Sequence, residues 1–160
     1  MVSRTVLRTS LWLAMGTWVG SWGFFAFVVS RIAFQVLPGD VAGDLAGALL
    51  AILHFGGAGA ALVAAAAAAA LGRRGLVVGL PVLLAIVCLA SELWLSPEVA
   101  AVRPSTLGAD STMETQLRFQ TLHRVSLGLF MLVHLASLIL VWLYARLDTR
   151  DLASAAEAPN

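Results

Sequence analysis

Charged residues are scarce in this chain: they make up 12% of its 160 residues, whereas a soluble domain carries about 25%. Hydrophobic residues make up 60% of the chain, and the mean hydropathy is +0.91. This composition excludes an ordinary soluble globular domain and a disordered polar chain, because both need far more charge in contact with water. We therefore expect lipid to be the main solvent of this protein, and a lipid bilayer to be its first partner.

Lysine is absent, and all ten basic residues are arginine. The net charge is only +1, and no basic patch is present. The chain therefore lacks the electrostatic pattern of a nucleic-acid-binding protein, and no nucleic acid partner is expected. Cysteine occurs once, as Cys88, so an intramolecular disulfide is excluded. Because Cys88 lies in an apolar run, it is expected to be an inert packing residue.

The motifs of the common enzyme classes are also missing. There is no Gly-x-Ser-x-Gly, no His-Glu-x-x-His, no phosphate-binding loop and no dinucleotide fingerprint. Ser126 lies one helical turn from His123, but no acid that could orient the pair follows from the sequence, so a membrane-embedded hydrolase has little support. We predict no catalytic residues and no metal site.

Four apolar segments are each long enough to cross a bilayer, which takes about 20 residues. They are residues 11–36, 45–71, 76–95 and 119–145. This pattern predicts an all-α fold, an integral membrane four-helix bundle over residues 1–147, followed by a polar C-terminal tail over residues 148–160 that we expect to be disordered. A cleaved signal peptide is the alternative for the first segment, but its length favours a span.

The distribution of charge predicts the orientation of the four spans. One side of the membrane would carry six arginines, namely Arg4, Arg8, Arg73, Arg74, Arg146 and Arg150. The other side would carry most of the acidic residues, namely Asp40, Asp44, Glu98, Asp110 and Glu114, with Arg103 and Arg118. By the positive-inside rule, we expect a multi-pass protein of the cell membrane with both termini in the cytoplasm.

A few ionisable residues fall inside or at the ends of the spans, where a charge is costly. Arg31, Glu92, His123 and Arg124 all lie towards the non-cytoplasmic ends of their spans. We expect them to converge there with Arg103 and Arg118, and we expect Glu92 to pair with Arg31 or with an arginine near the fourth span. Three interpretations stay open: a salt-bridge clasp between helix ends, a mouth or gate that binds an anionic or polar ligand, or unpaired residues that snorkel to the interface.

Two histidines, His54 and His134, lie deeper, near the middle of the second and fourth spans when a rise of about 1.5 Å per residue is counted. Hydrogen bonding between helices is the simpler role for such residues. The alternative is a haem- or metal-binding electron-transfer protein in which these imidazoles are the ligands. No further ligand spacing accompanies them, so no cofactor is predicted.

Three segments together resemble the transmembrane protein 205-like family, which consists of small four-span membrane proteins of bacteria and eukaryotes. The segments are FFAFVVSRIAFQVLPGDVAG, LWLSPEVAAVR and LRFQTLHRVSLGL. They carry the motif residues Phe34, Pro38, Pro97, Arg103, Phe119, His123 and Ser126. The resemblance implies an integral membrane protein without a firmly assigned reaction. The chain departs from the family at Phe130, where an asparagine is common, and His134 follows one turn later.

The sequence therefore favours a non-enzymatic multi-pass membrane protein with a polar cluster at the non-cytoplasmic end of its bundle. The roles left open are a scaffold and a carrier of a small solute. Four spans leave little room for a transport path within one chain, so a transport role would favour a homo-oligomer.

Overall fold

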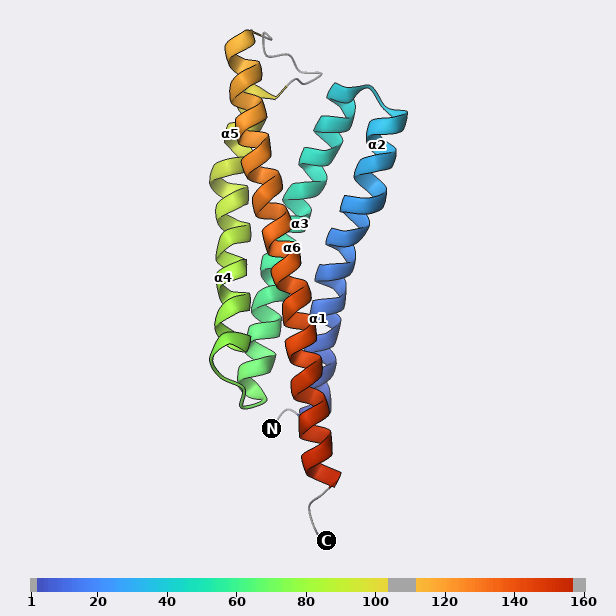
Figure 1. Ribbon diagram of the computed structural model, residues 1–160, viewed down its shortest axis with the longest axis vertical. Helices are drawn as coiled ribbons and strands as arrows, with labels where there is room; N and C mark the ends of the chain where they lie inside the picture. The colour runs from blue at the N-terminus through green and yellow to red at the C-terminus, as the bar shows by residue number, and fades with distance from the viewer. Residues whose placement is uncertain (1–2, 104–111, 157–160) are drawn as a thin grey trace.

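The computed structural model describes residues 3–103 and 112–156, and the regular structure in this part of the chain is entirely helical (Figure 1). The elements are α1 (Arg4–Phe24), η1 (Phe25–Val29), α2 (Ser30–Val36), α3 (Gly39–Ala70), α4 (Leu76–Ala90), η2 (Ser91–Leu95), α5 (Ser96–Val102) and α6 (Met113–Ala156). The η elements are single π-helical turns that continue their neighbours, so the chain forms four long helical spans: Arg4–Val36, Gly39–Ala70, Leu76–Val102 and Met113–Asp151. The all-α membrane bundle predicted from hydropathy is confirmed.

The four spans run alternately up and down. Both termini, together with the turn between α3 and α4, lie at one end of the bundle, which we call the terminal end; the turn between α2 and α3 lies at the other, which we call the far end (Figure 1). Gly72 and Gly75 shape the turn between α3 and α4, with φ angles of 84° and 68°. Glycine adopts this left-handed conformation without the steric cost that a side chain would bring.

The core is built from small residues on α3 and large ones on α1 and α6. Alanines of α3, including Ala61, Ala64 and Ala68, are fully buried. The large buried side chains are Leu11, Met15, Trp18, Trp22, Leu140 and Tyr144. Leucine, isoleucine and phenylalanine side chains cover much of the outside. This distribution suits lipid as solvent. In a bilayer, close packing of small residues holds helices together, because apolar side chains gain nothing by leaving lipid for the protein interior.

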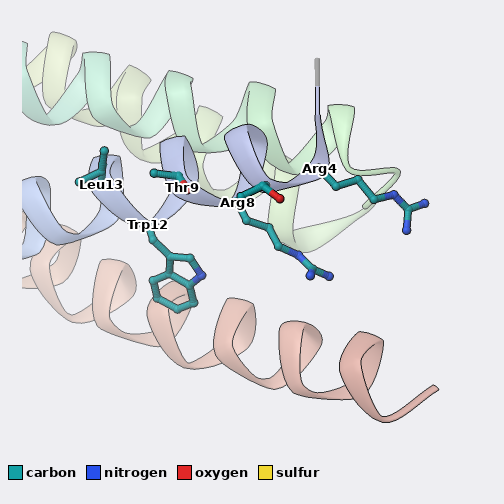
Figure 2. A pocket seen from close by; sticks show the side chains of 6 residues that line it. Arg4, Arg8, Thr9, Trp12 and Leu13 are labelled. Atoms are coloured by element: carbon teal, nitrogen blue, oxygen red, sulfur yellow. The ribbon is translucent and has the colours of Figure 1, made fainter. Parts of the chain in front are cut away.

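A network of ion pairs joins three parts of the chain at the terminal end. Asp148 of α6 pairs with Arg73 and with Arg8, whose Nε lies 3.4 Å from Asp148 Oδ1. Trp12 Nε1 donates to Asp148 Oδ2 at 2.8 Å. In Figure 2, the side chains of Arg8 and Trp12 extend from α1 towards α6. These contacts tie α1 and the α3–α4 turn to the last turns of α6.

The C-terminal segment differs from the expectation. Helix α6 continues to Ala156, so residues 148–156 are helical rather than a disordered tail. The physical reason is the network just described: Asp148 and Asp151 form ion pairs with Arg8 of α1, and those pairs hold the helix beyond its apolar part. Residues 157–160, the end of the expected tail, lie outside the described residues.

Candidate functional site

A cavity of about 600 Å³ lies within the far half of the bundle, and all four spans contribute to its wall. Most of the lining is apolar or aromatic. The polar side chains in the wall are those of Ser30, Glu92, Ser96, Arg103, His123 and Ser126. A volume of several hundred Å³, with mostly apolar walls and a few polar groups, is typical of a small-molecule site.

The cavity borders on the lipid-facing surface between α2 and α6. These two helices do not pack against each other in the described part of the chain, and their backbones diverge towards the far end (Figure 1). Phe27 and Phe34 line one side of this gap, Leu127 and Met131 line the other, and all four side chains are exposed. The rim of the cavity is therefore apolar and accessible from the region that lipid occupies.

Both π-helical turns help to shape this cavity. Ser30 N–H donates to the carbonyl of Phe25, and Ser96 N–H donates to the carbonyl of Ser91, a spacing of five residues in each case. Segment η1 presents Phe25 and Phe27 to the cavity, and η2 presents Glu92. Such turns rotate the side chains that follow them and often occur at functional sites. We did not predict them; the only sequence signal is a serine at the end of each.

The carboxylate of Glu92 is bonded to α3 and to its own helix. His54 Nδ1 lies 2.9 Å from Glu92 Oε2, and Ser96 Oγ donates to the same oxygen at 3.0 Å. The side chains of His54 and Glu92 are 5% and 15% exposed, so this pair is largely shielded. The ring of Trp22 meets the His54 ring edge-on, with centroids 5.7 Å apart.

The prediction that Glu92 pairs with Arg31 or with an arginine near the fourth span is therefore wrong. Glu92 faces α3 inside the bundle, whereas Arg31 is exposed on α2 and has no ion pair with any described residue. The arginines at this end have other partners: Arg103 pairs with Asp44, and Arg118 Nη2 lies 2.5 Å from Glu98 Oε2. Helix rotation, which composition does not reveal, decides these partners.

Arg103 lies along α3 at the far side of the cavity. Its Nη2 donates to Asp44 at 2.8 Å, and its Nη1 donates to the carbonyl of Gly43 at 2.9 Å. A Cβ at Gly47 would meet this guanidinium directly. The glycines of α3 thus leave room for the arginine, and the contact ties the end of α5 to the start of α3.

The residues of the predicted polar cluster gather largely in this one place. Of the nine residues expected in the polar cluster, seven line the cavity: Phe34, Glu92, Pro97, Arg103, Phe119, His123 and Ser126. The other two do not: Arg31 is exposed, and Pro38 is the N-cap residue of α3. The cavity also uses residues that the sequence analysis did not assign to it, above all Phe25, Ser30, Gly47 and Ser96.

Phe130 lines the cavity, and His134 follows one helical turn later in α6 without lining it. Phe130 stacks on Trp22 with ring centroids 4.4 Å apart and meets Phe25 edge-on. His134 is buried, and a Cβ at Gly23 would lie 3.7 Å from its Cε1. No described residue bonds to His134 Nδ1. This region therefore forms an aromatic floor.

The two histidines do not form a shared site in the described part of the chain. His54 uses Nδ1 for Glu92, and neither His54 nor His134 lines the far-end cavity. Among the described residues, no group of three histidine, cysteine or acidic side chains could hold a metal ion. The electron-transfer alternative stays a prediction to be tested by spectroscopy.

A second, shallower hollow lies at the terminal end along the first turns of α1 (Figure 2). It measures about 520 Å³ and is lined by Arg4, Thr5, Arg8, Thr9, Trp12 and Leu13. All of these belong to one helix. Arg8 is already engaged by Asp148 and Asp151, so this hollow is part of the helix-end network rather than an enclosed site.

Fold and cavity together define a multi-pass, all-α membrane protein with a hollow in the far half of its bundle. Residues 13–105, more than half of the chain, match the family described as Domain of unknown function (DUF4149), and the chain belongs to that family. The match includes Phe34, Glu92 and Arg103 and ends before α6. No curated protein matches the chain, and no solved structure does.

Proposed function

We propose that this protein binds a small amphipathic molecule in the far-end cavity and does no chemistry on it. The observation that carries this proposal is a hollow of about 600 Å³ whose apolar rim is open towards lipid and whose wall holds a few polar side chains. An alkyl chain would lie between Phe34 and Met131, and a polar head would reach Glu92, Ser96 and His123. We also propose that this protein is related to the transmembrane protein 205-like family, because most of that family's motif residues line the cavity.

The location of the polar groups supports binding over a purely structural clasp. A clasp would be complete once each charge had found its partner, as Arg118 does with Glu98 outside the cavity. Around the cavity, one ion pair, Arg103 with Asp44, and one hydrogen-bonded pair, His54 with Glu92, are formed as well. Their formation nevertheless leaves a hollow between the spans, which a clasp does not need. These two pairs hold the walls, and the hollow is left for a ligand.

The proposed site faces the non-cytoplasmic half of the bilayer. The terminal end carries the six arginines of the positive-inside pattern, so the cavity at the opposite end would take its ligand from the outer leaflet or the outer surface. Between the cavity and the terminal end stands the packed layer of Trp18, Trp22 and Phe130. Movement of a solute through a single chain would require that layer to open. We therefore favour binding of the ligand by the single chain, and transport would require a homo-oligomer.

The test is photolabelling of the purified protein in lipid nanodiscs with a dodecanol analogue that carries an alkyl diazirine. We expect saturable labelling of α2 and α6 at the rim, suppressed by excess dodecanol. Ala46 lines the cavity and Ala66 is exposed elsewhere on α3, which makes a matched pair. Ala46→Trp should abolish the saturable labelling, and Ala66→Trp should retain it. Labelling that spreads evenly over all lipid-facing surfaces without saturation would refute a cavity ligand.

A further inference from the structure

We infer that the far-end cavity selects amphiphiles with a cationic head, such as an alkylammonium, over anionic amphiphiles with the same chain. The inference rests on the proposed function and names the class of ligand. Three titratable side chains line the cavity: Glu92, Arg103 and His123. Whether the cavity prefers a cationic or an anionic head depends on which of these side chains has a charge that no neighbouring residue compensates.

Arg103 would attract an anionic head only weakly. Its guanidinium is bonded to the carboxylate of Asp44 and to the carbonyl of Gly43, and it is packed against Gly47. Nε is enclosed by protein and has no hydrogen-bond partner among the described residues, so of the five N–H groups only the second hydrogens of Nη1 and Nη2 could still reach a ligand. The positive charge is thus compensated by Asp44, and an anionic head in the cavity would gain little from it.

Glu92 keeps a free acceptor. Both of its side-chain contacts, from His54 and from Ser96, use Oε2, and no described residue is hydrogen-bonded to Oε1. A neutral imidazole with its proton on Nδ1 is sufficient for the bond to His54, so this bond does not by itself cancel the carboxylate charge. A carboxylate within a membrane span is costly when no cation balances it. A cationic head close to Oε1 would supply the missing balance.

Aromatic rings strengthen the same preference. Phe25, Phe34, Phe119 and Phe130 all line the cavity. The faces of aromatic rings attract cations and repel anions, and cages of such rings are the usual recognition site for quaternary ammonium groups. His123 stacks on Phe119, with centroids 5.4 Å apart, while Arg31 and Arg124 are exposed and do not line the cavity. The cavity wall thus combines one incompletely bonded carboxylate with several phenyl groups.

The experiment compares three head groups on one chain. Dodecyltrimethylammonium, dodecanol and dodecyl sulfate compete, below their micelle-forming concentrations, against the diazirine label in nanodiscs of zwitterionic lipid. We expect the ammonium to compete roughly tenfold more strongly than the sulfate, with the alcohol between them. Ala46→Trp discs report the labelling that comes from partition into lipid alone, which is subtracted. Glu92→Gln should lose the preference for the ammonium over the sulfate, whatever its affinity for the alcohol.

The possible outcomes separate this inference from the proposed function. If no head group competes, dodecanol included, the cavity holds no amphiphile and the proposed function fails. If dodecanol competes but the sulfate equals or exceeds the ammonium, only the inference is overturned, and Arg103 becomes the anchor. A preference that persists unchanged in Glu92→Gln also overturns it. The ranking in the unaltered protein is decisive even if that variant does not fold.

Discussion

His54 and Glu92 are 38 positions apart in the sequence, and their side chains meet at 2.9 Å across the interface of α3 and η2. The pair connects the middle of the second span to the π-helical turn that shapes the cavity. It is the only contact between an imidazole and a carboxylate among the ion pairs of the described residues.

Replacement of His54 should destabilise the fold because it leaves a shielded carboxylate without its main partner. We expect His54→Leu to lower the free energy of unfolding in detergent by about 1–3 kcal/mol, the cost of an unsatisfied buried polar group. The control is Glu98→Gln, which removes the exposed pair with Arg118 and should cost at most about 1 kcal/mol. Equal losses in the two variants would contradict a structural role for the buried pair.

Two neighbouring glycines of α3 should respond in opposite directions to alanine. A Cβ at Gly57 would lie 2.9 Å from Trp18 Nε1 and 3.1 Å from Trp22 Nε1, both on large buried rings. Overpacking of this kind typically costs about 1–3 kcal/mol, so Gly57→Ala should lower the stability measured by thermal unfolding. A Cβ at Gly56 would have no atom of another described helix or side chain within 4 Å. Gly56→Ala should therefore be neutral or stabilising by up to about 1 kcal/mol, because alanine favours the helix. A stable Gly57→Ala would show that the indole rings can move aside.

Loss of the Asp148 carboxylate should release the last turns of α6. Asp148 accepts the indole hydrogen of Trp12 and pairs with Arg8 and Arg73. Hydrogen bonds to a charged group are worth about 1.5–3 kcal/mol. In Asp148→Asn, hydrogen exchange of the amides from residue 148 onward should become faster, by roughly tenfold or more. Asp151→Asn is the comparison, since Asp151 is half exposed and its ion pairs among the described residues are with Arg8 and Arg73. Faster exchange of equal size in both variants would assign no special role to Asp148.

Labelling of single cysteines should establish the orientation in the membrane. With Cys88 changed to alanine, Glu98→Cys reports the far end and Arg74→Cys the terminal end; both positions are exposed. In intact cells, an impermeant maleimide should label Glu98→Cys and should reach Arg74→Cys only after lysis, because the positive-inside rule predicts a cytoplasmic location for the arginine-rich end. The reverse pattern would place the cavity on the cytoplasmic side.

The absorption spectrum of the purified protein tests the electron-transfer alternative. We expect a colourless protein without a Soret band, since His54 is engaged by Glu92 and no described cavity is lined by both histidines. A Soret band that disappears in His54→Ala or His134→Ala would instead establish haem ligation. Elemental analysis of the same sample tests for a bound non-haem metal ion, and we expect none.

Hydropathy alone predicted the fold class and the four spanning helices. The apolar runs predict four helices because a backbone in hydrocarbon must satisfy its own hydrogen bonds, and residues 3–103 and 112–156 contain four helices of that length and apolarity. The same reasoning brings Phe34, Arg103 and His123 to one end, because their places in the spans leave no other end for them. It failed at residues 148–156, where ion pairs to α1, rather than hydropathy, keep the helix intact.

The amino-acid sequence by itself determined the number of spans, their alternation and the end at which the polar residues gather, because these depend on local composition and chain length. Only the tertiary structure decided that Glu92 bonds to His54 rather than to an arginine, and that Arg103 lies on the glycines of α3. Those choices depend on the rotation of each helix about its axis. That rotation is set by packing between residues far apart in the chain and, in η1 and η2, by one π-helical turn.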